Sequence, residues 1–233
     1  MKVSCVRVPK RCNHVLMGQT TIHLLRHGEV YNPDKILYGR LPGFRLSERG
    51  QQMAQVVADS LRADGRDIVG LVASPLQRAQ ETAAPITAAF GLEMREDARL
   101  IEADSKFEGT RIGAEPWRLL HPGRWPKLVN PFTPSWGEPY VNMVARVQSA
   151  VEDAREQFAG HEAVLVSHQL PVWVTRLAYE NKRLWHNPRK RQCTVCSLTS
   201  LVFDDDGDLV GIEYSEPAAH LSKTLSAEGW SPK

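Results

Sequence analysis

The residues that could do chemistry are charged and imidazole side chains placed where apolar runs stop. In "IHLLRHGEVYN", residues 22–32, an apolar run ends at Arg26 and His27 and is followed by Gly28. Arg78 follows a second apolar run, and His168 ends another. Arginine offers a planar fork of N–H donors that matches phosphate oxygens, and neutral imidazole is a good nucleophile near pH 7. Together these residue types fit phosphoryl transfer, which needs an aligned nucleophile and positive charge around the phosphate.

A carboxylate and two hydroxyl groups accompany these side chains. Glu102 follows a third, shorter run and could protonate a leaving oxygen and later activate water. Ser74 comes directly after the second run, and Ser167 directly before His168. The helix that carries Arg78 would add the positive end of its dipole. Because arginines and a second histidine supply the positive charge, we expect neither a metal ion nor a cofactor.

The elements that must position these groups alternate between strand and helix. Continuous apolar runs bounded by turn residues are typical of buried strands, and apolar residues three or four positions apart are typical of helices. Ser47 is expected to cap the first helix and Ser74 the second, with Pro75 at its first position and Gly91 at its end. We expect buried strands at 20–27, 67–74 and 162–168, a short strand within 92–102, helices at 46–62, 74–91, 137–160 and 169–180, and a closing hairpin at 194–214.

This alternation predicts an α/β fold with a mostly parallel sheet. Ligands bind at the carboxyl ends of the strands in such sheets, which is where the polar groups above fall. Pro85 is expected to kink or break its helix. In the helix at 137–160 we expect Val141, Val144, Val147 or Gln148, Val151 and Phe158 to mark the inner face.

Four motifs together resemble one family. The segments "LLRHGEV", "SPLQRAQETA", "RLIEADSKFEG" and "AVLVSHQLPV" resemble the histidine phosphatase superfamily, whose fold is phosphoglycerate mutase-like. The resemblance runs from about Thr21 to about Val174 and implies a three-layer α/β/α sandwich. It implies that His27 becomes phosphorylated, that Arg26, Arg78 and His168 bind the phosphate, and that Glu102 donates the proton.

The resemblance is incomplete in two segments. The acidic segment "LIEADSKFEG" is one residue shorter than the family pattern and lacks its central glycine, so Glu108 is an alternative proton donor and Asp104 a third. Asn32 lies one position nearer to the Arg-His-Gly motif than the asparagine of mutases does. We interpret Asn32 and Arg40 as possible substrate-binding residues, with a solvent-facing role for Arg40 equally open.

Composition sets the wider limits. The chain has 233 residues and a formal charge of +2, with no basic stripe typical of nucleic-acid binding and no apolar run long enough for a membrane helix. We expect residues 1–16 to be a flexible or spurious extension, and 17–233 to be one domain with an irregular insertion at about 104–140.

The absence of a signal peptide favours the cytoplasm, where the four cysteines stay reduced. "CTVC" (193–196) is expected to place two small apolar side chains in a strand rather than to form a redox or zinc pair. His23 is expected to be structural.

These observations predict a metal-independent phosphomonoesterase that acts on a small phosphorylated metabolite through phosphohistidine. Two alternatives remain: a phosphoglycerate mutase, which would return the phosphate to its substrate, and a non-catalytic phospho-ligand binding protein. The partner is expected to be a small phosphate monoester, not nucleic acid or membrane, and a homodimer is left open. The loop at 29–46 and the insertion are expected to set specificity.

Overall fold

The structure is a computed structural model that describes residues 18–111 and 137–222. The expectations for the extension at 1–16 and for most of the insertion at 104–140 concern residues outside the described ranges.

A six-stranded sheet forms the centre of the molecule. Its order is β3-β2-β4-β1-β5-β6. The first four strands are parallel, and β5 and β6 continue the sheet in antiparallel pairing. The predicted α/β fold with a mostly parallel sheet is confirmed. The strands are β1 (Thr20–Arg26), β2 (Ile68–Ala73), β3 (Arg95–Glu96), β4 (Glu162–Ser167), β5 (Leu198–Phe203) and β6 (Leu209–Ser215).

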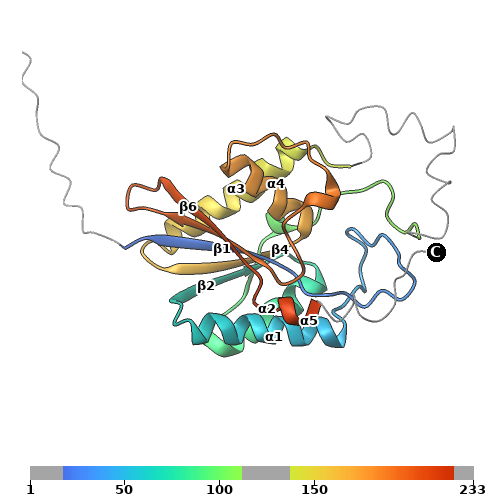
Figure 1. Ribbon diagram of the computed structural model, residues 1–233, viewed down its shortest axis with the longest axis horizontal. Coiled ribbons are helices and arrows are strands. Elements are labelled where there is room, and N and C mark those ends of the chain that lie inside the picture. The colour runs from blue at the N-terminus through green and yellow to red at the C-terminus, as the bar shows by residue number, and fades with distance from the viewer. Residues whose placement is uncertain (1–17, 112–136, 223–233) are drawn as a thin grey trace, which may run out of the picture.

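Helices cover both faces of this sheet, which gives the predicted three layers (Figure 1). On one face lie α1 (Glu48–Ala63), α2 (Gln77–Phe90) and the short α5 (Ala219–Ser222). On the other lie α3 (Tyr140–Gln157) and α4 (Gln169–Tyr179). Two single 3-10 turns, η1 (Ala98–Leu100) and η4 (Pro188–Lys190), lie in the connections.

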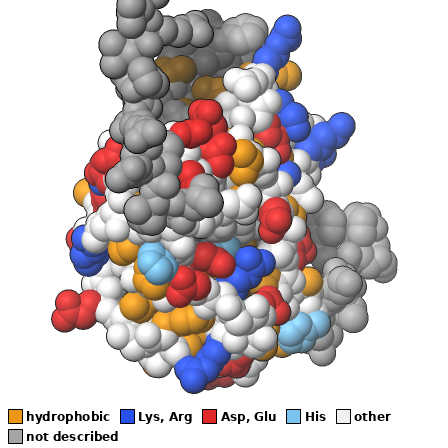
Figure 2. Space-filling model, turned by 90° about the vertical axis from the view of Figure 1, so that its left-hand side faces the viewer, with side chains coloured by type: hydrophobic (Ala, Val, Ile, Leu, Met, Phe, Trp, Pro, Cys, Tyr) orange, Lys and Arg blue, Asp and Glu red, His pale blue; other side chains and the backbone are white. Residues whose placement is uncertain are grey.

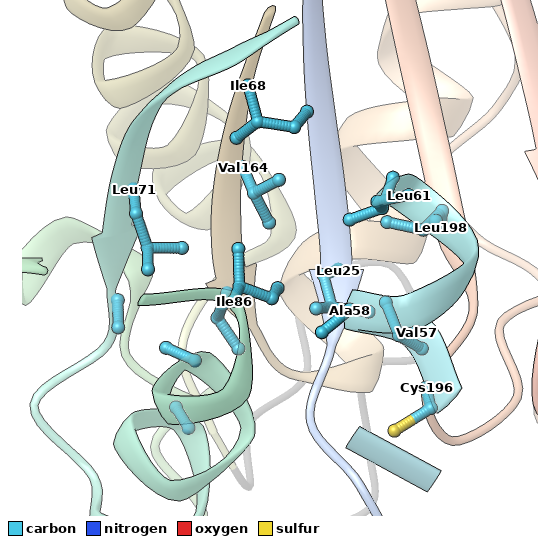
Figure 3. Packing of buried hydrophobic residues seen from close by; sticks show 14 of the residues in the cluster. Leu25, Val57, Ala58, Leu61, Ile68, Leu71, Ile86, Val164, Cys196 and Leu198 are labelled. Atoms are coloured by element: carbon cyan, nitrogen blue, oxygen red, sulfur yellow. The ribbon is translucent and has the colours of Figure 1, made fainter. Parts of the chain in front are cut away.

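Two apolar cores hold the layers together, one on each face of the sheet. On the α1/α2 face, Leu25 and Val164 from the sheet pack against Val57, Leu61 and Ile86 from the helices (Figure 3). On the other face, strand residues such as Ile22 and Leu165 pack against α3 and α4. Each such side chain contributes about 1.5–3 kcal/mol when it leaves water. The central strands, and therefore their ends, are firmly held.

The bounds of α1 and α4 lie within two residues of those predicted, whereas α2 and α3 each begin three residues later than predicted. The Ser47 hydroxyl caps α1 by accepting a 2.9 Å hydrogen bond from the Gly50 N–H. The prediction that Ser74 caps α2 is wrong, because the helix begins at Gln77 and its N-cap is Leu76. Ser74 instead directs its hydroxyl to His168. Gly91 ends α2 in the left-handed conformation, and the helix runs through Pro85 without a break.

The inner face of α3 was predicted correctly except at its start. Val144, Val147 and Val151 are buried, together with Met143, Ala150 and Ala154. Val141 is 64% exposed, so its assignment to the inner face is wrong. An α-helix turns by about 100° per residue, which places Val141 about 120° from the centre of the buried stripe. Successive valines three residues apart rotate away from the centre of the buried stripe. Met143, Ala150 and Ala154 complete the stripe instead.

The buried polar residue His23 is structural. His23 is buried in β1, and its ring nitrogens contact Ser200 Oγ in β5 and Glu162 Oε2 in β4, both at 2.7 Å. These contacts agree with the expected structural role.

Cys193 and Cys196 are free and buried, as small apolar side chains are, but they precede β5 rather than lie in it. The strand assignment of "CTVC" is therefore wrong, and Cys196 has a left-handed backbone with φ of 56°.

On the face at the left of Figure 1, acidic and basic side chains are mixed (Figure 2). Among the residues that the structure describes, no helix is both long and apolar enough to cross a membrane.

Candidate active site

The carboxyl ends of three neighbouring strands place the predicted polar groups side by side. Arg26 at the end of β1 pairs in register with Ser167 at the end of β4. Backbone hydrogen bonds continue one residue beyond the strands, from His27 N to Ser167 O at 3.0 Å and from Ser74 N to Val166 O at 2.9 Å. Sheet pairing therefore fixes the backbone of the candidate residues themselves.

His27 is buried and held in one tautomer. Its Nδ1 lies 2.8 Å from the Gly28 carbonyl oxygen, and because a carbonyl only accepts, Nδ1 carries the hydrogen. The lone pair is then on Nε2. Burial lowers the pKa of His27 well below its usual value, and the positive charges of Arg78 and Arg26 lower it further. The ring is therefore neutral near pH 7 and able to act as a nucleophile.

Gly28 lets this segment approach two helices closely. Its N–H donates to Thr82 Oγ1 at 3.0 Å, and that hydroxyl donates to the Arg78 carbonyl at 2.7 Å. A Cβ atom at position 28 would lie 2.7 Å from the Gly50 carbonyl oxygen in α1. The expected need for close backbone approach at Gly28 is met by the packing of α1 and α2.

Two arginines border His27, each held by a backbone carbonyl. Arg26 Nη1 donates to Cys193 O, and Arg78 Nη2 donates to Gly39 O, both at 2.7 Å. The Arg78 guanidinium also lies 4.8 Å from the centre of the Tyr38 ring. In both arginines, Nε is buried and has no partner among the described residues. Two fixed guanidinium groups with uncommitted donors suit an anion such as phosphate.

His168 lies beside His27 at the end of β4. The two ring centroids are 5.1 Å apart, and His168 Nε2 contacts Ser74 Oγ at 2.8 Å. Nδ1 is buried without a partner in the described part of the chain. Burial lowers the pKa of His168 well below its usual value, and protonation of the neighbouring His27 and the charge of Arg78 lower it further. The structure thus brings together His27, His168, Arg26 and Arg78.

Glu102 faces the same space from the segment after η1. One carboxylate oxygen accepts a 2.8 Å hydrogen bond from the Ala103 N–H. Burial raises the pKa of Glu102 above its usual value, although the Ala103 N–H and the charges of Arg78 and Arg26 oppose this shift. A carboxyl group that keeps its proton to higher pH suits a general acid.

The two other candidate donors are placed differently. Glu108 Oε1 accepts a 2.8 Å hydrogen bond from the Arg40 backbone N–H. This carboxylate therefore joins its own segment to the loop at 29–46. Asp104 is exposed on the cavity wall. Glu102 lines the cavity and has a raised pKa, which fits the role of proton donor.

The two candidate substrate-binding residues are engaged with the protein. The Asn32 side chain lines the cavity, but its amide bonds to the backbone N–H and carbonyl of Ile36 at 3.0 and 2.8 Å. Arg40 Nε donates to the Glu102 carbonyl at 2.7 Å, and its Nη2 contacts Glu138 at 3.0 Å. Asn32 therefore shapes the loop at 29–46, and Arg40 holds the segment that carries Glu102.

A cavity of about 620 Å³ is lined by Arg26, His27 and Glu102, among other residues. This volume is in the range that accepts small-molecule ligands. Sequence reasoning missed several of its wall residues, because no periodicity singles them out as cavity residues. These are Lys35, Tyr38, Tyr140, Gln169 and Arg191. Among the described residues no group of three or more His, Cys, Asp or Glu side chains could hold a metal ion.

Comparison with known proteins identifies relatives across most of the chain. The family model "Histidine phosphatase superfamily (branch 1)" matches residues 22–212. "Uncharacterized protein Rv0525" of Mycobacterium tuberculosis is 57% identical over 201 residues, 86% of this chain and 98% of that protein. "Phosphoserine phosphatase 1" of Hydrogenobacter thermophilus is 30% identical, over 64% of this chain and 71% of that protein.

Two solved structures show the same fold. The structure of Bacillus stearothermophilus YhfR superposes with a TM-score of 0.70 at 24% identity, covering 83% of this chain and 96% of that one. The mycobacterial glucosyl-3-phosphoglycerate phosphatase Rv2419c gives a TM-score of 0.65 at 25% identity, covering 84% and 96%.

Proposed function

The chain belongs to the histidine phosphatase superfamily, and on that premise we propose that it hydrolyses a small phosphorylated metabolite through a phosphohistidine at His27. One observation carries this proposal. The Nδ1–H bond to Gly28 leaves the Nε2 lone pair of His27 free, in a site where two arginines provide positive charge. A neutral nucleophile beside fixed cations is the arrangement that phosphoryl transfer requires.

The proposed reaction has two steps. In the first, the Nε2 lone pair of His27 attacks phosphorus, the bond from phosphorus to the ester oxygen breaks, and the leaving oxygen takes the proton of Glu102. In the second, the Glu102 carboxylate takes a proton from water as the oxygen of that water attacks phosphorus. The P–N bond then breaks, phosphate leaves, and both side chains return to their initial state.

The surrounding residues support both steps electrostatically. The phosphate oxygens would be held by Arg26, Arg78 and His168. The attraction between each arginine and the phosphate would be stronger than in water, because the site is partly shielded from solvent. His168 would donate through its ring to a phosphate oxygen. No metal ion is needed to neutralise the phosphate in this scheme, because the two guanidinium groups do so.

The names of relatives agree with a phosphatase. Phosphoserine phosphatase 1 and the mycobacterial glucosyl-3-phosphoglycerate phosphatase both act, by their names, on phosphate monoesters. A purified, chelator-treated protein should hydrolyse a generic aryl phosphate. His27→Ala should remove that activity, whereas His161→Ala, at an exposed histidine beside Asp67, should retain it. Equal activity in wild type and His27→Ala would overturn the proposal.

A phosphoglycerate mutase is the second candidate. The protein named probable phosphoglycerate mutase GpmB, from Enterobacter, is 30% identical over 76% of this chain and 83% of its own length. A mutase would return the phosphate of the phosphoenzyme to the organic substrate instead of to water. Interconversion of 2- and 3-phosphoglycerate at a rate above that of phosphate release would favour the mutase.

A non-catalytic binding protein is the remaining alternative. It would bind phosphate esters without forming a covalent bond. Rapid acid-free denaturation after mixing with labelled substrate would trap a phosphoenzyme that is acid-labile and is absent from His27→Ala. Binding without a trapped phosphoenzyme and without phosphate release would favour this alternative.

A further inference from the structure

Arg191 lies on the wall of the catalytic cavity and has no carboxylate partner among the residues that the structure describes. It comes after η4, in the connection between α4 and β5, and is partly buried. No carboxylate of the described residues lies within ion-pair distance of its guanidinium, although buried charges are normally paired. The cavity wall also contains Glu102 and Arg26, whose charges act on the pKa of Arg191. The guanidinium therefore belongs to the same electrostatic environment as the reacting groups.

Two neutral side chains hold Arg191 in position. Its Nε donates to His186 Nε2 at 2.8 Å, and its Nη1 donates to Gln169 Oε1 at 3.2 Å. His186 Nδ1 lies 2.6 Å from the Leu184 carbonyl and must therefore carry the hydrogen, which leaves Nε2 as an acceptor. Burial lowers the pKa of His186, which keeps Nε2 unprotonated. Nη2 has no hydrogen-bond partner in the described part of the chain, so it is available to a ligand.

The position of Arg191 is also fixed relative to the phosphate-binding groups. Gln169 Nε2 donates to Cys193 O at 3.2 Å, and the same carbonyl accepts from Arg26 Nη1 at 2.7 Å. One amide and one carbonyl therefore link the two guanidinium groups. A ligand that contacts both must carry its two anionic groups a short distance apart.

The other charged residues of the cavity wall favour a monoanion at Arg191. Glu138 is already paired with Arg40 and Arg146. Lys35 is exposed, and an exposed lysine is a mobile point charge. Asp104 is acidic and lies on the same wall, where it would repel a dianion more than a monoanion. A carboxylate, which is planar and singly charged, can pair with the guanidinium and meets less repulsion from Asp104 than a second phosphate group would.

We propose that Arg191 determines substrate specificity by binding a carboxylate of a short phosphorylated carboxylic acid while Arg26 and Arg78 bind its phosphate. This inference rests on the proposed function and names the substrate class of that same site. Gln169 and His186 act as positioning residues for Arg191.

A matched pair of substrates tests the proposal. 3-Phosphoglycerate and glycerol 3-phosphate share the phosphate ester and differ in having a carboxylate or a hydroxymethyl group. Arg191→Gln should lower the ratio of kcat/KM for 3-phosphoglycerate over glycerol 3-phosphate by about 10- to 100-fold, as expected for loss of a charge-assisted hydrogen bond. Arg189→Gln removes the same charge from an exposed position two residues away and should leave the ratio unchanged.

Variants of His186 separate positioning from general damage. His186→Gln can keep an acceptor near the former Nε2, whereas His186→Phe keeps a ring beside Tyr140 and Trp173 but removes the acceptor. His186→Phe should therefore raise KM for 3-phosphoglycerate with little change in kcat, and His186→Gln should restore KM in part. A ratio of kcat/KM within twofold of wild type in Arg191→Gln would overturn the proposal.

The outcome is separable from that of the proposed function. Hydrolysis of an aryl phosphate that depends on His27 tests the reaction alone, because such a substrate has no carboxylate. Calorimetric binding of 3-phosphoglycerate to His27→Ala, with and without Arg191→Gln, tests the carboxylate site without turnover. Equal affinity in the two proteins would refute the role of Arg191 whether or not the chain is a phosphatase.

Circular dichroism would detect loss of folding in Arg191→Gln. Arg191→Lys then replaces that variant, and we expect it to lose the preference for 3-phosphoglycerate over glycerol 3-phosphate to a smaller degree.

Discussion

A methyl group at position 28 would collide with the backbone of α1. The Cβ atom of Gly28→Ala would lie 2.7 Å from the Gly50 carbonyl oxygen and 3.3 Å from Cys196 Sγ. Ordinary contact begins at 3.4 Å, so residue 28 and α1 must separate by about 0.7 Å. Because the closer obstacle is backbone, no side-chain rotation can relieve the clash. The movement is transmitted to His27, the preceding residue.

Two magnitudes follow from this displacement. A misplacement of about 1 Å costs on the order of 10²-fold in rate, so a shift of about 0.7 Å should lower kcat/KM by roughly 10- to 100-fold. Overpacking costs about 1–3 kcal/mol in the free energy of unfolding. For a chain of this size, each kcal/mol lowers Tm by about 2–4 °C.

The assay compares Gly28→Ala with a glycine that has room. At Gly211 in β6, a Cβ atom would meet Val202 at an ordinary 3.7 Å, so Gly211→Ala is the matched control. Hydrolysis of an aryl phosphate is measured well below the Tm of each variant, and Tm is measured by circular dichroism. Wild-type kcat/KM in a Gly28→Ala protein of lowered Tm would show that α1 alone moves. A Gly28→Ala protein with wild-type kcat/KM and wild-type Tm would refute the reasoning about close approach.

Three further predictions concern protons. Glu102→Gln should lower kcat for alkyl phosphates by about 10²- to 10⁴-fold, and much less for an aryl phosphate whose leaving group needs no proton; equal losses would contradict the role of general acid. The pH profile of kcat/KM should have an acid limb with an apparent pKa below 6.5, because burial lowers the pKa of His27, and an alkaline limb from Glu102, whose pKa burial raises above 4.5. The alkaline limb should be absent in Glu102→Gln, and an acid limb above pH 6.5 would count against a neutral His27. Finally, the pKa values of His27 and His168 are lowered on folding, so the unfolded chain binds protons first as pH falls through 6.5. The free energy of unfolding, measured by urea denaturation, should therefore fall below pH 6.5, and less steeply in His168→Asn; an unchanged slope would exclude His168 as a source.

The sheet and its site-bearing ends could be predicted because their signals are local. A strand buried on both faces is apolar throughout, so the point at which Arg26 and His27 replace apolar residues is visible in one sequence. The same holds for His168 after β4. Parallel strands then bring these points together without any further information. Helix details were less predictable, because Ser74 fits a helix cap by residue type but bonds to His168 through tertiary contact.

The loops could not be predicted, because their side chains are placed by contacts distant in sequence. Arg40 looked like a substrate ligand or a solvated residue, but it binds the Glu102 carbonyl, 62 positions away. Arg191 depends on Gln169, 22 positions away, and on the Nε2 acceptor of His186, which the backbone of Leu184 sets. No spacing rule links such residues, and the walls of the cavity therefore emerge only from the folded chain.

His23 has a consequence for how the chain reaches this fold. β1 is buried on both faces, so burial alone would tolerate a slip of one residue against β4 and β5. A slipped strand would turn the imidazole of His23 away from Glu162 and Ser200, leaving buried groups unpaired at about 1–3 kcal/mol each. One polar side chain thus selects the alignment among competing alignments. Because His27 follows on the same strand, the selection that aligns β1 also sets the depth at which the nucleophile emerges from the sheet.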